Sequence, residues 1–508
     1  MSVLLLTRYG LGGALSRDEA VYAYAGQQVA RGVPPFASIF DPKGPGAGLV
    51  AGAAVALAHV LDVDDLLAMR VAFLLFAVGT GVVLYLLATR LFGSVLAGVT
   101  AAVTMATFHG WAFDALSGPD AKVPGIFFAA LAMLLLVVRR PAWAAAAGSL
   151  AALVWQPLFV YPTLAVVLAG ITARPGRRLL GALRVLVAAA VPMLLVVVYA
   201  LATGTFADLV QVTLVFPLVG ISHGRETALQ HVTRVLHVVD AAYGQGPVAV
   251  TFWVGALLLA GLCAVRLTRR VPGPGPDPLV WAVGLTGLLE AAYALVDFQG
   301  YPDVYPLLAY PALGMAGGVS LVLARPWPRA GRVLVAATTA LLLAAFAGST
   351  AEGFADSAAA GRANELRPEL SDACAVQRLL GSHGTLWALG DPTPLVLTDR
   401  TNPDRYIYLG SAVDRWKEEH TVGGLAGWEH RIAAVHPALL VRDGWYSHVQ
   451  HRLSRWLLHD GYVQAFVGTW RVFLGTGLRQ HAHALHVLLT RVPTALAPTT
   501  CPVARQVS

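Results

Sequence analysis

Long apolar runs alternate with short polar connectors over roughly the first 350 residues of the chain. Runs such as 68–89 and 182–202 reach or exceed the ~18–20 residues that a helix needs to cross a bilayer. The pattern predicts a mainly α-helical, polytopic transmembrane bundle with about eleven spans. The expected spans are 3–15, 68–89, 92–111, 123–138, 142–156, 157–172, 182–202, 248–265, 279–296, 304–323 and 333–349.

Two segments near the N-terminus fit this pattern less well. The run 3–15 is short for a span and contains Arg8. The run 44–61 is apolar, but it begins with Gly44-Pro45-Gly46 and is rich in small residues. If it crossed the membrane, the side of every later connector would be reversed. We therefore interpret 44–61 as a juxtamembrane or membrane-embedded helix inside a first outer loop over 16–67.

Composition excludes several protein classes. Hydrophobic residues make up 56% of the chain and charged residues only 13%, against about 25% in globular proteins. A disordered protein, a coiled coil and an ordinary cytosolic enzyme are therefore excluded. The net charge of +7 does not indicate a nucleic-acid partner, because the arginines form short clusters between apolar runs.

These arginine clusters predict the orientation of the bundle. Alternate connectors are rich in Arg, whereas the connectors between them are rich in Asp and Glu. Loops rich in Lys and Arg stay in the cytoplasm. We therefore expect a multi-pass protein of the cell membrane with its N-terminus in the cytoplasm and all residues after 350 outside. The basic connectors hold Arg90, Arg139, Arg140, Arg174, Arg177, Arg178, Arg266, Arg269, Arg270, Arg325, Arg329 and Arg332.

From about residue 350 the chain becomes richer in charged and aromatic residues. This change predicts two domains, a transmembrane domain over 1–349 and a soluble extracytoplasmic α/β domain over 350–508. Strands are expected at 384–389, 394–398, 437–442, 461–467 and 469–474. Helices are expected at 372–381, 425–436 and 445–459.

Candidate chemistry is concentrated in the first outer loop. Asp18 and Glu19 stand where the first predicted span ends, and Lys43 follows between two prolines in Asp41-Pro42-Lys43-Gly44-Pro45. A carboxylate at the membrane boundary can act as a general base toward a hydroxyl. A lysine in a rigid loop can bind a phosphate as a point charge. A structural reading stays open, in which the two acids cap a helix and Lys43 extends toward water.

Together with the topology, these motifs resemble those of the GT-C superfamily of integral-membrane glycosyltransferases. The nearest branch is family 39-like, with the protein O-mannosyltransferases and the aminoarabinose transferases, and actinobacterial polyprenyl- or dolichyl-phosphate-mannose mannosyltransferases are the most similar. The resemblance rests on Asp18-Glu19, on the loop Asp41–Pro45 and on Asp120, which matches an acid at the outer end of a later helix. Gly44 departs from the pattern, which has a proline there.

The resemblance implies inverting transfer of a monosaccharide, mannose by analogy, from a polyprenyl-phosphate donor at the extracytoplasmic face. The acceptor would be a protein, a lipid or a glycan, and membrane lipid would surround the bundle. Asp18 would be the general base, with Glu19 beside it as the second catalytic carboxylate. The leaving group is a polyprenyl phosphate, so no nucleotide-binding motif is required. Some members of the superfamily use a divalent metal and others do not, so the resemblance allows a metal without requiring one.

Further residues are assigned to the same site. The candidates for binding the donor phosphate are Lys43, Lys122 and Arg225. The candidates for positioning the acceptor or the sugar are Asp120, Asp41, Tyr22, Asp297 and Asp303.

The three cysteines give no metal motif, because none has CxxC or Cys/His spacing. Cys263 lies in an apolar run, whereas Cys374 and Cys501 both fall in the predicted outer domain. Outside the cytoplasm a disulfide can persist. The pair is therefore a candidate disulfide, and two free thiols are the alternative.

Two other function classes are considered. A transporter or lipid flippase would also have many spans, but it predicts symmetry between two halves, which the sequence lacks, and the acids gather on one face. A sensor or assembly protein predicts that mutation of Asp18 is harmless. The main hypothesis is therefore a glycosyltransferase, with a transporter or flippase as the alternative.

Overall fold

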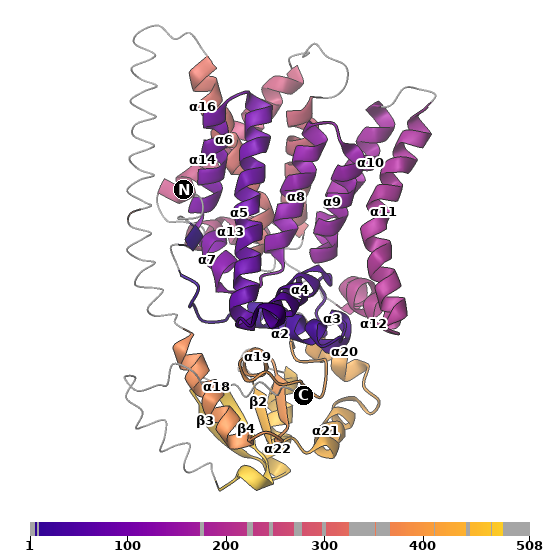
Figure 1. The fold of residues 1–508 in the computed structure, drawn as a ribbon, viewed down its shortest axis with the longest axis vertical. Coiled ribbons are helices and arrows are strands. Elements are labelled where there is room, and N and C mark those ends of the chain that lie inside the picture. Colours follow the sequence, from indigo (N-terminus) through magenta and orange to yellow (C-terminus); the bar gives the residue numbers. More distant parts are fainter. Residues whose placement is uncertain are drawn as a thin grey trace.

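The fold is known from a computed structural model of the 508-residue chain. It describes residues 6–7, 10–172, 177–220, 227–242, 247–268, 277–296, 301–324, 351, 366–410, 412–442, 448–468 and 470–480. A bundle of apolar helices stands at one end of a smaller domain that contains a sheet, and short helices lie between the two (Figure 1).

The bundle contains helices of very different lengths. Four described helices are long and apolar enough to cross a membrane, and the bent pair α6 and α7 makes a fifth when it is counted as one span. The chain is therefore a membrane protein with several candidate spans. The four long helices are α5 (Asp65–Phe92), α11 (Arg178–Ala202), α14 (Pro247–Thr268) and α16 (Tyr305–Ala324). The other helical segments are α6 (Val95–Thr107), α7 (His109–Ser117), α8 (Lys122–Val137), α9 (Pro141–Val154), η2 (Gln156–Phe159), α10 (Val160–Thr172), α12 (Phe206–Val210), η4 (Gln211–Gly220), α13 (Ala228–Ala242), η5 (Leu279–Gly284), α15 (Leu285–Val296) and η6 (Tyr301–Val304).

Two of the predicted spans need correction. Residues 10–16 are not helical, so the predicted span 3–15 is wrong over its second half. A glycine-rich sequence has a low propensity for helix. The buried guanidinium group of Arg70 donates hydrogen bonds to the carbonyl oxygens of Leu11 and Gly13, so these backbone groups have partners outside a helix. The predicted span 92–111 is two helices, because the extended backbone of Phe108 separates α6 from α7, which are bent by 69°. The predicted span 333–349 lies outside the described residues.

The run 44–61 contains a helix, as predicted. It forms α4 (Gly46–Leu61), which packs beside α2 (Arg17–Ala30) and near the short helix α3 (Pro35–Ser38). Small residues allow this packing: a Cβ atom on Gly26 of α2 would lie 2.6 Å from the Cβ of Ala51 in α4. The three helices lie between the bundle and the C-terminal domain (Figure 1).

The C-terminal domain has a four-stranded mixed sheet in the order β1-β2-β4-β3. β1 (Leu386–Leu389) and β2 (Leu439–Arg442) are parallel, whereas β4 (Trp470–Leu474) runs antiparallel to β2 and to β3 (Val463–Val467). The strands predicted at 384–389, 437–442, 461–467 and 469–474 agree with this sheet. The helices are α18 (Arg367–Leu380), α19 (Thr393–Thr398), α20 (Val413–Glu419), α21 (Gly424–Val435) and α22 (His448–His459), with the turn η7 (Thr476–Leu478) at the end.

The strand predicted at 394–398 is wrong, because this segment is the helix α19. Its apolar run of four residues suits either structure. A proline in the first turn and the left-handed Asp399 at the end favour the short helix. The predicted boundary between 349 and 350 lies outside the described residues, as most of 325–365 does.

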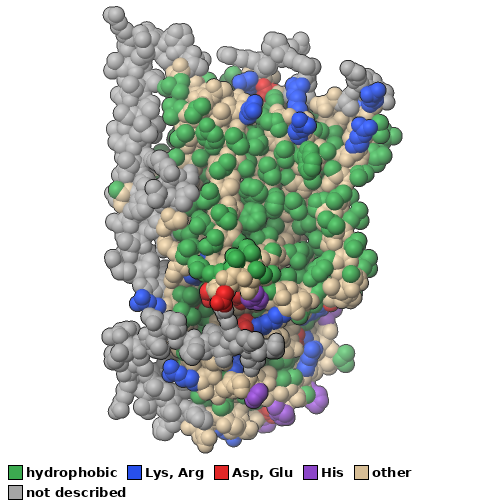
Figure 2. Space-filling view, in the orientation of Figure 1, with side chains coloured by type: hydrophobic (Ala, Val, Ile, Leu, Met, Phe, Trp, Pro, Cys, Tyr) green, Lys and Arg blue, Asp and Glu red, His purple; other side chains and the backbone are tan. Residues whose placement is uncertain are grey.

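Charge is distributed unevenly along the molecule. Hydrophobic side chains cover the bundle. Lys and Arg side chains lie at the end of the bundle far from the C-terminal domain, and others lie on and near that domain (Figure 2). The acidic and histidine side chains visible on this face lie mostly at the end near α2 and on the C-terminal domain (Figure 2). Polar ends around an apolar belt are the arrangement that a bilayer requires.

Candidate functional site

The first turn of α2 positions the two acids predicted from the sequence. Ser16 caps this helix, and Glu19 completes a capping box by accepting a hydrogen bond of 2.8 Å from the backbone N–H of Ser16. Glu19 is only 2% exposed, whereas the side chain of Asp18 is 40% exposed. Glu19 therefore caps the helix, as the structural alternative expects, whereas the Asp18 carboxylate is accessible.

The Lys43 side chain reaches back to α2. Its ammonium nitrogen lies 5.2 Å from the centroid of the Tyr22 ring and donates a hydrogen bond to the Tyr22 hydroxyl oxygen. The Tyr22 hydroxyl in turn donates to the Asp41 carboxylate. Burial alone would lower the pKa of Lys43, but Tyr22, Asp18 and Asp41 act against it and raise that pKa well above its usual value. Lys43 is therefore a fixed positive charge.

The same buried setting acts on the two groups beside this lysine. Burial, with a smaller effect from nearby Asp41, raises the pKa of the Tyr22 hydroxyl well above its usual value. Burial also raises the pKa of Asp41, and Lys43 partly opposes the rise. Tyr22 therefore stays a hydrogen-bond donor at neutral pH.

The loop that carries Lys43 is packed against the end of α9. A Cβ atom on Gly44 would lie 1.9 Å from the backbone oxygen of Leu153, so only glycine fits at this close approach. The side chain of Gln156 also donates a hydrogen bond of 2.7 Å to the carbonyl oxygen of Pro42. These contacts explain why glycine stands where the resemblance expects proline, and they fix the Lys43 backbone.

Asp120 and Lys122 enter the site from the connection between α7 and α8. The backbone N–H of Lys122 donates a hydrogen bond of 2.7 Å to the Asp120 carboxylate. The Lys122 ammonium group forms an ion pair with Asp303 of η6 and lies 4.8 Å from the centroid of the Trp155 ring. Burial raises the pKa of Asp120, while Lys43 and Lys122 oppose that rise. Asp120 thus lies within electrostatic range of both lysines.

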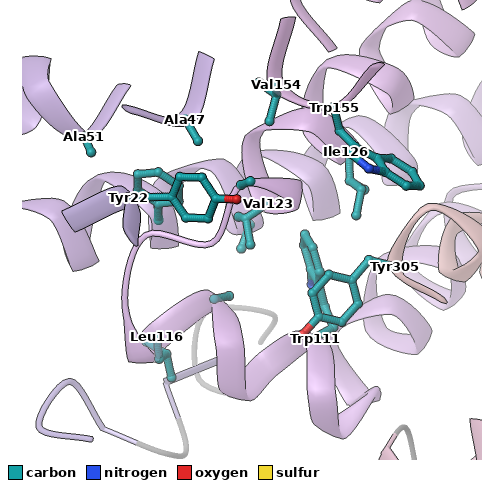
Figure 3. Packing of buried hydrophobic residues seen from close by; sticks show 14 of the residues in the cluster. Tyr22, Ala47, Ala51, Trp111, Leu116, Val123, Ile126, Val154, Trp155 and Tyr305 are labelled. Carbon is teal, nitrogen blue, oxygen red and sulfur yellow. The ribbon is translucent and has the colours of Figure 1, made fainter. Parts of the chain in front are cut away.

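Tyr22 faces the start of α8. Its hydroxyl points toward Val123, and Trp155 and Tyr305 lie farther along the same apolar cluster (Figure 3). All four residues are buried. The charged groups of Lys43 and Lys122 therefore lie at the border of a well-packed core, in which the positions of Tyr22 and Trp155 are fixed.

The sequence interpretation missed one buried acid, Asp114 in α7. Tyr305 donates hydrogen bonds to the Asp114 carboxylate and to the carbonyl oxygen of Gly110. Burial, followed by Asp114, raises the pKa of Glu19 well above its usual value, so Glu19 holds its proton more strongly than an exposed acid. An acid within an otherwise apolar segment is itself a signal of function and would have identified Asp114.

A cavity of about 20 Å³ lies beside this cluster. Its wall includes Tyr22, Asp41 and Lys43, together with Phe36 from α3 and Thr213 from η4. Within the described part of the chain, no three His, Cys, Asp or Glu side chains converge as metal ligands would.

The structure thus brings together most of the residues predicted from the first outer loop and its neighbours. Asp18, Tyr22, Asp41 and Asp120 all lie within electrostatic range of Lys43, and Lys122 and Asp303 form an ion pair. Arg225 and Asp297 lie outside the described residues. Cys374 is disulfide-bonded and Cys263 is free. The predicted partner of Cys374, Cys501, lies outside the described residues.

No protein-family profile and no curated protein matches the chain. Solved structures do match over nearly its full length. ArnT from Cupriavidus metallidurans in the apo state has a TM-score of 0.60 at 14% identity, covering 93% of this chain and 95% of its own. The same protein bound to undecaprenyl phosphate has a TM-score of 0.58 at 15% identity, covering 93% and 96%. The chain therefore shares the fold of these solved structures.

A second group of similar structures extends this likeness. The apo oligosaccharyltransferase of Archaeoglobus fulgidus has a TM-score of 0.56 at 14% identity, covering 87% of this chain and 68% of its own. The archaeal oligosaccharyltransferase AglB from the same organism, in complex with an inhibitory peptide and a dolichol-phosphate, has a TM-score of 0.53 at 13% identity, covering 94% and 73%. At these identities the comparison establishes the fold alone.

Proposed function

We propose that the chain is a membrane glycosyltransferase that transfers one monosaccharide from a polyprenyl-phosphate donor to an acceptor hydroxyl. The observation that carries this proposal is the cluster around Lys43. Accessible Asp18, buried Tyr22 and Asp41, and Asp120 from a distant connection surround one lysine at the end of an apolar bundle. The likeness to ArnT, whose structure holds undecaprenyl phosphate, supports the donor class.

In the proposed reaction Asp18 accepts the proton of the acceptor hydroxyl. The hydroxyl oxygen then attacks the anomeric carbon, the bond from that carbon to the phosphate oxygen breaks, and the polyprenyl phosphate leaves with the electron pair. Attack from the side opposite the leaving group inverts the anomeric centre. Lys43 balances the charge that develops on the leaving phosphate. Asp41 and Tyr22 hold the ammonium group in place.

The finer assignments are also proposals. Mannose is the expected sugar, by resemblance to the family 39-like branch. Glu19 and Asp120 would position the substrates, with Arg225, Lys122, Asp297 and Asp303 as further candidates. We also propose about eleven spans, a division at 349/350 and a C-terminal domain outside the cytoplasm, which would place the Lys43 cluster at the extracytoplasmic face. The Arg side chains at the far end of the bundle support this orientation (Figure 2).

The test is transfer by the purified protein from labelled polyprenyl-phosphate-mannose, with the label traced into protein, lipid and glycan fractions. Asp18→Asn should reduce turnover by ~10²–10⁴-fold, the usual effect of removing a general base. Asp460→Asn is the matched control, because Asp460 is an exposed acid on the C-terminal domain. Wild-type turnover in Asp18→Asn would exclude Asp18 as the general base. If the wild-type protein transferred no sugar from any polyprenyl-phosphate donor, the proposed glycosyltransferase function would be excluded.

A further inference from the structure

A second and much larger pocket lies where the C-terminal domain meets the first outer loop. Its volume is about 600 Å³, within the range of sites that hold small molecules. Ala37 of α3 contributes to the wall, and the rest comes from the C-terminal domain. Those residues are Pro403, Asp404, Arg405, Tyr406, Lys417, His420, Thr421, Val422 and Arg431.

The wall of this pocket has an excess of positive charge. It contains two arginines and one lysine, against a single acid, Asp404. That acid is already engaged, because its carboxylate lies 3.0 Å from the Lys417 ammonium nitrogen. Arg405 is paired with Asp208 of α12. Arg431 has no ion-pair partner among the residues that the structure describes, and it is exposed.

These cations are held together at an electrostatic cost. Lys417 is only 4% exposed and lies 4.2 Å from the centroid of the Tyr406 ring. Burial lowers the pKa of Lys417, Asp404 opposes this change, and Arg431 and Arg405 add to the lowering by repulsion. An anion beside these cations would offset the repulsion, so the pocket is suited to a negatively charged ligand.

The pocket also adjoins the Lys43 cluster. Ala37 lines the large pocket, and its neighbour Phe36 lines the small cavity beside Lys43. The backbone N–H of Phe40 donates a hydrogen bond of 2.8 Å to the carbonyl oxygen of Arg405, and the Phe40 ring stacks on Tyr406 at 4.7 Å. A ligand in the large pocket would therefore lie next to the proposed reaction centre.

We propose that this pocket binds the anionic group, phosphate or carboxylate, of a saccharide-bearing acceptor. Lys417 and Arg431 provide the charge, and Tyr406 and Pro403 offer apolar surface to a sugar ring. That the ligand is the acceptor rests on the proposed glycosyl transfer. The binding of an acidic saccharide does not depend on it.

Calorimetric titration of the purified full-length protein tests the binding. The probes are glucose 6-phosphate and glucuronate, with glucose as the uncharged control. Both acids should bind saturably and glucose should not. Arg431→Gln and Lys417→Gln should each weaken binding of the acids roughly tenfold, the usual effect of removing one charged hydrogen bond. Arg455→Gln is the matched control, since Arg455 is exposed on α22 and does not line the pocket.

Arg431→Gln keeps the test decisive even if the buried Lys417 variant fails to fold, because Arg431 is exposed. Absence of binding, or equal binding by wild type and Arg431→Gln, would overturn the proposed site. The titration is repeated in nanodiscs with and without phosphatidylglycerol. Unchanged affinity supports a saccharide ligand, whereas competition by the anionic lipid would assign the pocket to a lipid headgroup and overturn the proposal.

A transfer assay separates this inference from the proposed function. In Arg431→Gln the KM for an acidic acceptor should rise roughly tenfold while kcat is retained, because Arg431 does not contact the Lys43 cluster. An unchanged KM would show that the acceptor does not bind in this pocket. If the wild type transfers no sugar but binds the acidic saccharides, the proposed function fails and the anion site stands.

Discussion

Replacement of Gly44 by alanine tests how strictly the Lys43 loop must be placed. The new Cβ atom would lie 1.9 Å from the backbone oxygen of Leu153, whereas real Cβ contacts are essentially never under 3.0 Å. The loop or the end of α9 must therefore move by about 1.1 Å, because the nearest atoms of Leu153 belong to its backbone and not to a flexible side chain. A misplacement of about 1 Å costs on the order of 10²-fold in rate when it affects a catalytic group. We expect Gly44→Ala to reduce turnover by about that factor.

The assay is steady-state transfer from a labelled polyprenyl-phosphate sugar, with the unfolding midpoint measured in the same detergent. Gly12→Ala is the control, because a Cβ atom there meets nothing within 4 Å. Gly44→Ala should lose turnover and raise the KM for the donor, since Lys43 moves with the loop, while Gly12→Ala should match wild type. Full turnover in a correctly folded Gly44→Ala protein would refute the argument that the close approach to Leu153 positions Lys43.

Three further expectations can be checked independently. Burial raises the pKa of Glu369, which accepts a hydrogen bond from the Leu15 backbone, from 4.5 to about 7. The stabilising contribution of Glu369 is therefore complete below pH 4.5 and is lost as the pH rises through about 7. Between these pH values the unfolding midpoint of the wild type should fall more than that of Glu369→Gln. Equal falls in the two proteins would contradict this expectation. A reporter that works only outside the cytoplasm, fused after Ser508, should be active, and activity of a cytoplasmic reporter there would reverse the orientation. Peptide mapping of unreduced protein should recover Cys374 linked to Cys501, whereas alkylation of both thiols would exclude the pair.

Much of the fold could be predicted because long apolar runs mark helices that can cross a bilayer, and shorter apolar runs mark strands. The helices of the bundle and the four strands of the sheet follow runs that are visible in the sequence. The errors occur where local chemistry overrides the run. The extended backbone of Phe108 divides one apolar run into two helices. Pro394, in the first turn, favours the helix α19 where a strand was predicted. Neither effect changes the hydrophobic pattern.

The candidate site could be predicted in part, for a related reason. Asp18, Lys43 and Asp120 attract notice because charge is scarce in this chain. The sequence does not reveal that Tyr22 connects Lys43 to Asp41, since a tyrosine in a helix is ordinary. The pocket around Lys417 depends on residues from α3, α20 and α21, whose proximity only the tertiary fold creates.

The contacts of Arg405 impose an order on how this protein matures. Its guanidinium group donates to the carbonyl oxygen of Phe36, 369 residues earlier in the chain, and also binds Asp208 and Gln211. At ~5–20 residues per second, a ribosome needs roughly 20–75 s to make the intervening segment. The loop that carries Lys43 is thus among the first parts to be synthesised and among the last to be fixed. A chain that stops before the C-terminal domain would insert its helices yet lack the clamp that holds this loop, so interrupted synthesis yields a membrane protein without an assembled site.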